Sequence, residues 1–178
     1  EFVEVASRYI DLKQFLRHVA AEAYLAEFDG LVGEPSGMNN FHVYRFAGST
    51  KFTFIPWDKD LTFVGLERPI FTGLSDNVLT RRLMAIPEYR SFFLQTVAEA
   101  ASIMGGPEGL MEQTVNSLYN QIVDAAKSDP YKQCAIEGQQ VSCGPGEFEA
   151  SVEQLRQFAR TQQAWVMSQV SSAGASVN

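Results

Sequence analysis

Carboxylate and amide side chains are concentrated in residues 26–60, which read AEFDGLVGEPSGMNNFHVYRFAGSTKFTFIPWDKD. Asp29, Asn40, Asp58 and Asp60 supply oxygen atoms of the kind that hard divalent cations such as Mg²⁺ or Mn²⁺ prefer. Mg²⁺ is usually held by one or two protein carboxylates, while phosphates and water complete its shell. These residues therefore predict a site where a cation holds phosphates.

A β-hairpin is predicted between these residues. Residues 41–46 and 51–57 are rich in aromatic and β-branched side chains, and the sequence AGST joins them. Pro56 ends the second strand because it has no N–H group to donate to the ladder. The two ends of a hairpin lie together, so Asn40 and Asp58 are expected to meet at one edge of the sheet. Because aromatic residues occur on both faces, we expect both faces to be buried, with Trp57 as a core anchor beside Asp58.

The remainder of the chain is predicted to be mainly helical. Apolar residues recur at helical spacing over residues 11–26, where Asp11 and Gln14 resemble a capping box. His18 is expected on the solvated face of this helix. A helical half follows over residues 74–170, and residues 171–178 are expected to form a frayed tail. The predicted fold class is α+β, mainly α-helical, as one domain over residues 1–178 with one hairpin that carries the metal site.

Composition excludes several classes of protein. The chain has 178 residues, of which 46% are hydrophobic, so a folded globular chain is expected. Its net charge is −7 and it has no run of Lys and Arg that could neutralise phosphates, so no nucleic acid partner is expected. No apolar stretch approaches the roughly 20 residues of a transmembrane helix. The chain begins at Glu1 without a Met, and we expect upstream sequence to be missing.

Two cysteines, Cys134 and Cys143, flank the sequence AIEGQQVS in a segment that is expected to be a loop. They could form a disulfide or remain two free thiols. A disulfide would point to an oxidising, extracytoplasmic location. Two cysteines and two distant histidines do not form a zinc site.

The order of the acidic and amide residues is typical of kinase-like phosphotransferases. In those enzymes an Asp after a helix orients the hydroxyl nucleophile, a nearby Asn holds a metal, and a second Asp holds the metal ions. The segment also resembles the spore coat protein H (CotH) kinase family. The resemblance is carried by the residues FDG at 28–30, NNFHVY at 39–44 and above all FIPWDKD at 54–60; DLKQFLRHVAAEAYL, LTRRLMAIPEYRSFF and LRQFARTQQAWV add to it.

This resemblance implies an atypical protein kinase that transfers the γ-phosphoryl group of ATP to Ser or Thr of protein substrates, such as coat or surface proteins. Asp29 would be the catalytic aspartate. Asn40 and Asp58 would hold the cation that accompanies ATP, with Asp58 as the principal ligand and Asp60 in support. The implied location is extracytoplasmic, at a cell surface or spore coat.

The chain departs from the family and from ordinary kinases at several points. Asn39 stands where the family often has His. The sequence also contains no Gly-rich phosphate loop, no strand Lys and no partner Glu from a preceding helix. The chain is therefore interpreted as a protein-kinase-like C-terminal lobe, the catalytic half of such an enzyme. Without a nucleotide-binding N-terminal lobe, we expect weak nucleotide binding and negligible turnover.

Two alternatives remain open from the sequence. One is a non-catalytic surface or coat scaffold that uses a kinase-like fold to bind a protein partner. The other is a metal-dependent glycosyltransferase with a D-x-D motif, supplied here by Asp58 and Asp60. The second alternative requires a half with alternating strands and helices, and the sequence does not show that pattern.

Overall fold

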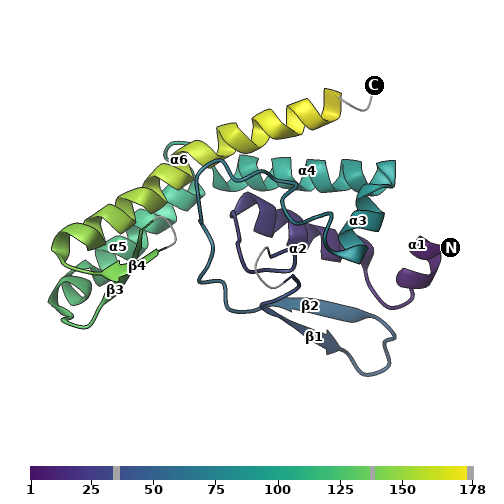
Figure 1. Ribbon diagram of the computed structural model, residues 1–178, viewed down its shortest axis with the longest axis horizontal. Helices are drawn as coiled ribbons and strands as arrows, with labels where there is room; N and C mark the ends of the chain where they lie inside the picture. The colour runs from purple at the N-terminus through teal and green to yellow at the C-terminus, as the bar shows by residue number, and fades with distance from the viewer. Residues whose placement is uncertain (34–36, 137–138, 176–178) are drawn as a thin grey trace.

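The structure is a computed structural model whose described residues are 1–33, 37–136 and 139–175 (Figure 1). Six helices and four strands occur among these residues, and the fold class is α+β and mainly helical, as predicted. In chain order the elements are α1 (Phe2–Ala6), α2 (Leu12–Tyr24), β1 (Phe41–Arg45), β2 (Phe52–Pro56), α3 (Val78–Met84), α4 (Pro87–Met104), α5 (Leu110–Ser128), β3 (Gln133–Ile136), β4 (Gln139–Ser142) and α6 (Pro145–Ala175).

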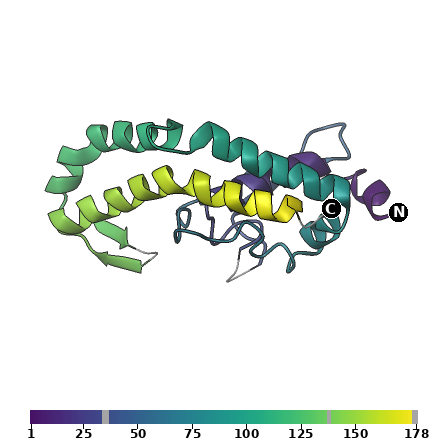
Figure 2. The ribbon, with the colours of Figure 1, turned by 90° about the horizontal axis from the view of Figure 1, so that it is seen from above.

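Helix α2 forms the centre of the molecule. Its first turn is capped by Asp11, whose carboxylate accepts hydrogen bonds from the backbone N–H groups of Lys13 and Gln14. Its apolar stripe packs against α4, and α4 packs against α6 (Figures 1 and 2). The largest side chains of this core are fully buried: Phe15, Tyr24, Phe93 and Phe158. The segment that follows α2 is therefore anchored at one end to this packed core.

The hairpin β1–β2 lies on the opposite side of α2 from α4 and has the predicted position (Figure 1). Phe54 contacts both Phe41 and Phe15 of α2, with ring centroids 5.4 and 5.2 Å apart. The other face of the hairpin is open, and Tyr44 and Trp57 are 51% and 59% exposed. The prediction that both faces are buried is wrong, because among the described residues α2 covers only one of them.

Trp57 is consequently not a core anchor. Its indole packs edge-on against the exposed His42 ring at a centroid distance of 4.9 Å. Alternation along the strands places Trp57 on the face that carries His42 and Ile55, away from α2. Aromatic side chains on a strand therefore indicated the hairpin correctly but not which of its faces is covered.

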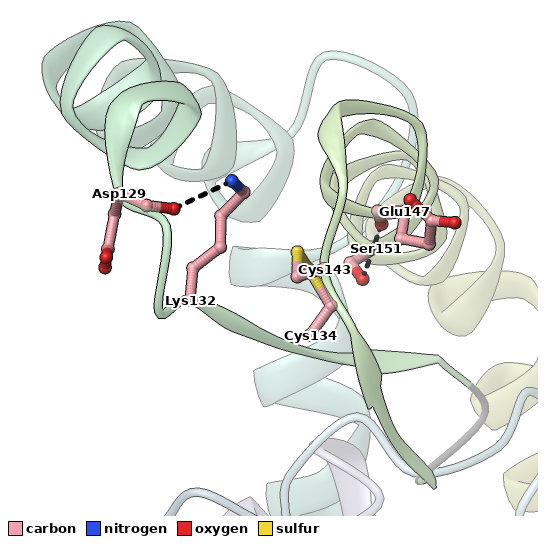
Figure 3. Close-up of a disulfide and its surroundings, with 6 residues drawn as sticks. All are labelled: Asp129, Lys132, Cys134, Cys143, Glu147 and Ser151. Carbon is pink, nitrogen blue, oxygen red and sulfur yellow. Dashed lines mark hydrogen bonds between the residues drawn. A yellow bond between two sulfur atoms is a disulfide. The ribbon is translucent and has the colours of Figure 1, made fainter.

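The second half of the chain differs from the prediction in two places. Residues 133–136 and 139–142 form a second antiparallel strand pair, β3–β4, where a loop was expected. Cys134 and Cys143 are joined by a disulfide beside this strand pair, with their Cα atoms 5.1 Å apart (Figure 3). Helix α6 continues to Ala175, so residues 171–175 of the expected frayed tail are helical, and residues 176–178 lie outside the described part.

Helix α5, the strand pair β3–β4 and the first half of α6 extend away from α2 as an arm (Figures 1 and 2). The arm is joined by contacts between α5 and α6 and between α6 and β3. Within the described residues, no helix has both the length and the apolar character needed to cross a bilayer.

Candidate functional site

The carboxylate of Asp29 is held by the side-chain amides of two consecutive residues. Asn39 Nδ2 donates to both Asp29 oxygens at 3.0 Å, and Asn40 Nδ2 donates to Oδ2 at 3.0 Å. Asp29 is half-buried and lies five residues beyond the last residue of α2. Hydrogen bonds from these two amide groups to both oxygens restrict the rotation of the Asp29 carboxylate.

The base of the hairpin brings Asn40 next to the D-x-D segment. The backbone carbonyl of Asn40 accepts a hydrogen bond from the N–H group of Trp57 at 3.0 Å, so Asp58 follows directly on the residue paired with Asn40. Because Nδ2 of Asn40 donates to Asp29, its Oδ1 is the atom that can face a cation. Asn40 thus contacts Asp29 through its side chain and pairs with Trp57 through its backbone. Asp58 is the next residue after Trp57.

Asn40 and Asp58 both have left-handed backbone conformations, with φ of 49° and 47°. Asn and Asp adopt this region more readily than other residues with a side chain, yet it remains unfavourable. Residues held in such conformations are concentrated at functional sites. Glycine would adopt this conformation more easily at both positions. The chain instead has residues whose side chains carry an oxygen atom that could bind a cation.

In the part of the chain that the structure describes, no cluster of carboxylates surrounds the base of the hairpin. Over residues 1–33, 37–136 and 139–175, no three His, Cys, Asp or Glu side chains are grouped so that they could hold a metal ion. Asp58 and Asp60 are exposed, and Asp29 is engaged by amides. An amide oxygen with one or two carboxylates nevertheless fits Mg²⁺ or Mn²⁺ accompanied by phosphates, since those ions complete their shells with phosphate oxygens and water.

Comparison with known proteins places the chain in a family. The family model described as CotH kinase protein matches residues 1–166. The chain belongs to the CotH kinase protein family. It is 25% identical over 145 residues to the inner spore coat protein H of Bacillus subtilis (strain 168), a match that covers 77% of this chain and 38% of that protein. The chain therefore spans about two fifths of the length of the relative.

Membership in the CotH family agrees with the resemblance expected from the FIPWDKD segment. The glycosyltransferase alternative receives no support from the fold. Both sheets of the described residues are two-stranded and antiparallel, and an alternating strand–helix half with parallel strands is absent from them.

Asn39 is a residue of the candidate site that sequence reasoning missed. Its side chain makes two of the three hydrogen bonds that amide groups of the described residues donate to the Asp29 carboxylate. The available signal was its position next to Asn40, at the point where the chain enters β1.

Glu27 is a second missed residue, and it supports the site through the backbone. It is buried, with 4% of its surface exposed, and its Oε1 accepts the backbone N–H group of Asp29 at 3.0 Å. Burial raises the pKa of Glu27 above the ordinary carboxyl value. The hydrogen bond from Asp29 and the charge of Lys59 oppose this effect, whereas the carboxylates of Glu22 and Asp29 add to it.

The raised pKa of Glu27 predicts how stability changes with pH. The folded protein retains this proton to a higher pH than the unfolded chain does. The resulting stabilisation is complete below the ordinary carboxyl pKa and is lost as pH rises through the raised value. A Glu27→Gln variant stays neutral and can still accept the Asp29 N–H bond. Its Tm relative to wild type is therefore expected to rise by a few degrees between about pH 4 and about pH 8.

Thermal melts of both proteins across that range test this expectation. A Tm difference that stays constant, or that becomes smaller as the pH rises, would contradict it. Glu99→Gln, at an exposed position on α4, provides the matched control and should show no such trend.

Proposed function

We propose that this chain is the catalytic part of an atypical protein kinase. The reaction is Mg²⁺- or Mn²⁺-dependent transfer of the γ-phosphoryl group of ATP to Ser or Thr hydroxyls of protein substrates. The observation that carries the proposal is the hydrogen bond between Asn40 and Asp29 at the base of the hairpin. Asp58 lies at the same end of the hairpin, directly after Trp57, which pairs with Asn40. A kinase-like site needs an aspartate for the hydroxyl and separate oxygen ligands for the cation, in this order along the chain.

In this proposal Asp29 orients the substrate hydroxyl and accepts its proton. A bond forms between the hydroxyl oxygen and the γ-phosphorus, while the bond from that phosphorus to the β–γ bridging oxygen breaks. Asn39 and Asn40 hold the Asp29 carboxylate, so its orientation is set before the substrate arrives. Oδ1 of Asn40 and the carboxylate of Asp58, supported by Asp60, would hold the cation. When bound, this cation would neutralise charge on the phosphates of ATP.

The proposed substrates are coat or surface proteins. The relative named inner spore coat protein H supports this class, and an extracytoplasmic position at a spore coat or cell surface agrees with the Cys134–Cys143 disulfide. The fold is proposed to correspond to the C-terminal lobe of a kinase. On this view the chain alone binds nucleotide weakly and turns over negligibly, so activity is assayed in the complete gene product.

A phosphorylation assay tests the proposal. The complete gene product is incubated with radiolabelled ATP and Mg²⁺ or Mn²⁺, with itself and casein as acceptors. We expect label on phosphoserine or phosphothreonine, and its loss when EDTA removes the cation. Transfer that persists in EDTA would contradict the metal-dependent mechanism. Absence of transfer together with absence of ATP binding would instead favour the non-catalytic scaffold.

A further inference from the structure

An ion pair between the buried Glu22 and the partly buried Lys59 joins the two segments that carry the proposed site. Glu22, near the end of α2, has only 4% of its surface exposed. Its Oε1 accepts a hydrogen bond from Lys59 Nζ at 2.7 Å, and Lys59 stands between Asp58 and Asp60. A buried carboxylate on the apolar stripe of a helix requires a partner, and Lys59 supplies the charge that it needs.

The same Glu22 carboxylate also holds the loop that contains Asp29. Its Oε2 accepts the backbone N–H group of Leu31 at 2.8 Å. A Cβ atom on Gly30 would lie 2.6 Å from this carboxyl group, so the carboxylate rests directly against the glycine backbone. Glu22 is therefore in contact with residues 30–31 on one side and with Lys59 on the other.

Lys59 is also close to the carboxyl group of Glu27, which accepts a hydrogen bond from the backbone of Asp29. Its Nζ lies 3.9 Å from Oε2 of Glu27, and Oε1 of Glu27 accepts the Asp29 N–H group. His18 completes the surroundings, with Nε2 3.1 Å from Oε1 of Glu22. His18 is half-buried rather than on the solvated face that the sequence predicted, because it lies one turn before Glu22 on α2.

We infer that Glu22 and Lys59 are positioning residues for the proposed phosphotransferase. Their ion pair fixes the Asp58–Asp60 segment against the Asp29 loop and thereby sets the distance between the aspartate for the hydroxyl and the ligands of the cation. This inference rests on the proposed function. In this role both residues act through the aspartates that they position, and not on the substrate or the phosphates themselves.

A pair that only stabilises the fold would give different results from a pair that positions ligands. The probe is MnCl₂ titrated into the complete gene product with ATP present, at a temperature well below the Tm of every variant. Lys59→Met and Glu22→Gln are each expected to weaken Mn²⁺ affinity by about tenfold or more. The double variant should lose no more affinity than the more affected single variant, because the two residues act as one unit. Lys59→Arg keeps the charge and should recover most of the affinity.

Glu112→Gln is the matched control. Glu112 is also a buried carboxylate: it accepts one backbone N–H group, from Glu108 at 2.8 Å, and pairs with one cation, Arg160, at 2.6 Å. This pair joins α5 to α6, two helices that do not carry any of the proposed site residues. Glu112→Gln should lower the Tm and leave Mn²⁺ affinity unchanged.

Unchanged Mn²⁺ affinity in folded Lys59→Met and Glu22→Gln would overturn the positioning role, and so would an equal loss of affinity in Glu112→Gln. Asp58→Asn serves as the reference for the cation site itself. If Asp58→Asn loses Mn²⁺ affinity while Lys59→Met does not, the positioning inference fails and the proposed function stands. If Asp58→Asn binds Mn²⁺ as wild type does, the proposed cation site fails, and the inference fails with it.

Discussion

Asp29→Asn in the complete gene product is expected to lower the rate of phosphoryl transfer by about 10²–10⁴-fold, the usual contribution of a positioned general base. The variant removes the charge that orients and deprotonates the hydroxyl. It keeps an amide oxygen that can still accept hydrogen bonds from Asn39 and Asn40, so the loop should remain folded. Phosphate incorporation into casein, measured under single-turnover conditions, gives the rate directly.

Asp29→Asn is expected to change the rate of phosphoryl transfer much more than the affinity for ATP. Because Asp29 is assigned to the hydroxyl and not to the cation, ATP affinity in the presence of Mn²⁺ should change by no more than about threefold. Asp124→Asn, at an exposed position on α5, is the control and should transfer phosphate at the wild-type rate. A rate for Asp29→Asn within a few-fold of wild type would remove Asp29 from the mechanism.

Several elements could be predicted from the sequence because their local signals agree with the fold. Asp11 and the apolar stripe after it define α2, and Pro87 with Gly105 bounds α4. The hairpin was predictable from aromatic strands around a short turn. The pairing of its strands brings Asn40 next to Trp57, the residue before Asp58. The candidate site depends on this arrangement.

Other features depend on tertiary contacts that a local pattern does not contain. Alternation cannot reveal that α2 covers one face of the hairpin and leaves Trp57 in solvent. The strands β3 and β4 have four residues each and are rich in Gln, so they resembled a loop. Residues 171–175 contain little apolar surface, yet they extend a helix that is already formed, and extension is easier than nucleation.

The supporting residues of the site carried a weaker signal. Glu22 lies seven residues after Phe15 and three after Val19, on the buried stripe of α2. A charged residue at such a position indicates a buried ion pair, but not the identity of its partner. Lys59 is 37 residues further along the chain, and only the folded hairpin brings it to Glu22.

Asp58→Asn is expected to weaken binding of Mn²⁺ in the presence of ATP by at least about a hundredfold, since removal of even a supporting residue commonly costs 10–100-fold. Asn is a better replacement than Ala at this position. The backbone has φ of 47°, which Asn tolerates as Asp does, whereas Ala in that region adds about 1–2 kcal/mol of strain. The Tm should therefore stay close to the wild-type value while the cation ligand is lost.

Asp60→Asn separates the principal ligand from the supporting one. Asp60 is exposed and two residues beyond Asp58, so its loss is expected to weaken Mn²⁺ binding less than the loss of Asp58 does. Equal effects of the two substitutions would contradict the assignment of Asp58 as the principal ligand.

The most direct test of the account is a calorimetric titration of ATP into the complete gene product with Mn²⁺ present, carried out in parallel on wild type and Asp58→Asn. The account predicts binding in the wild type that EDTA abolishes and that Asp58→Asn lacks. Equal, metal-independent binding in both proteins would contradict it.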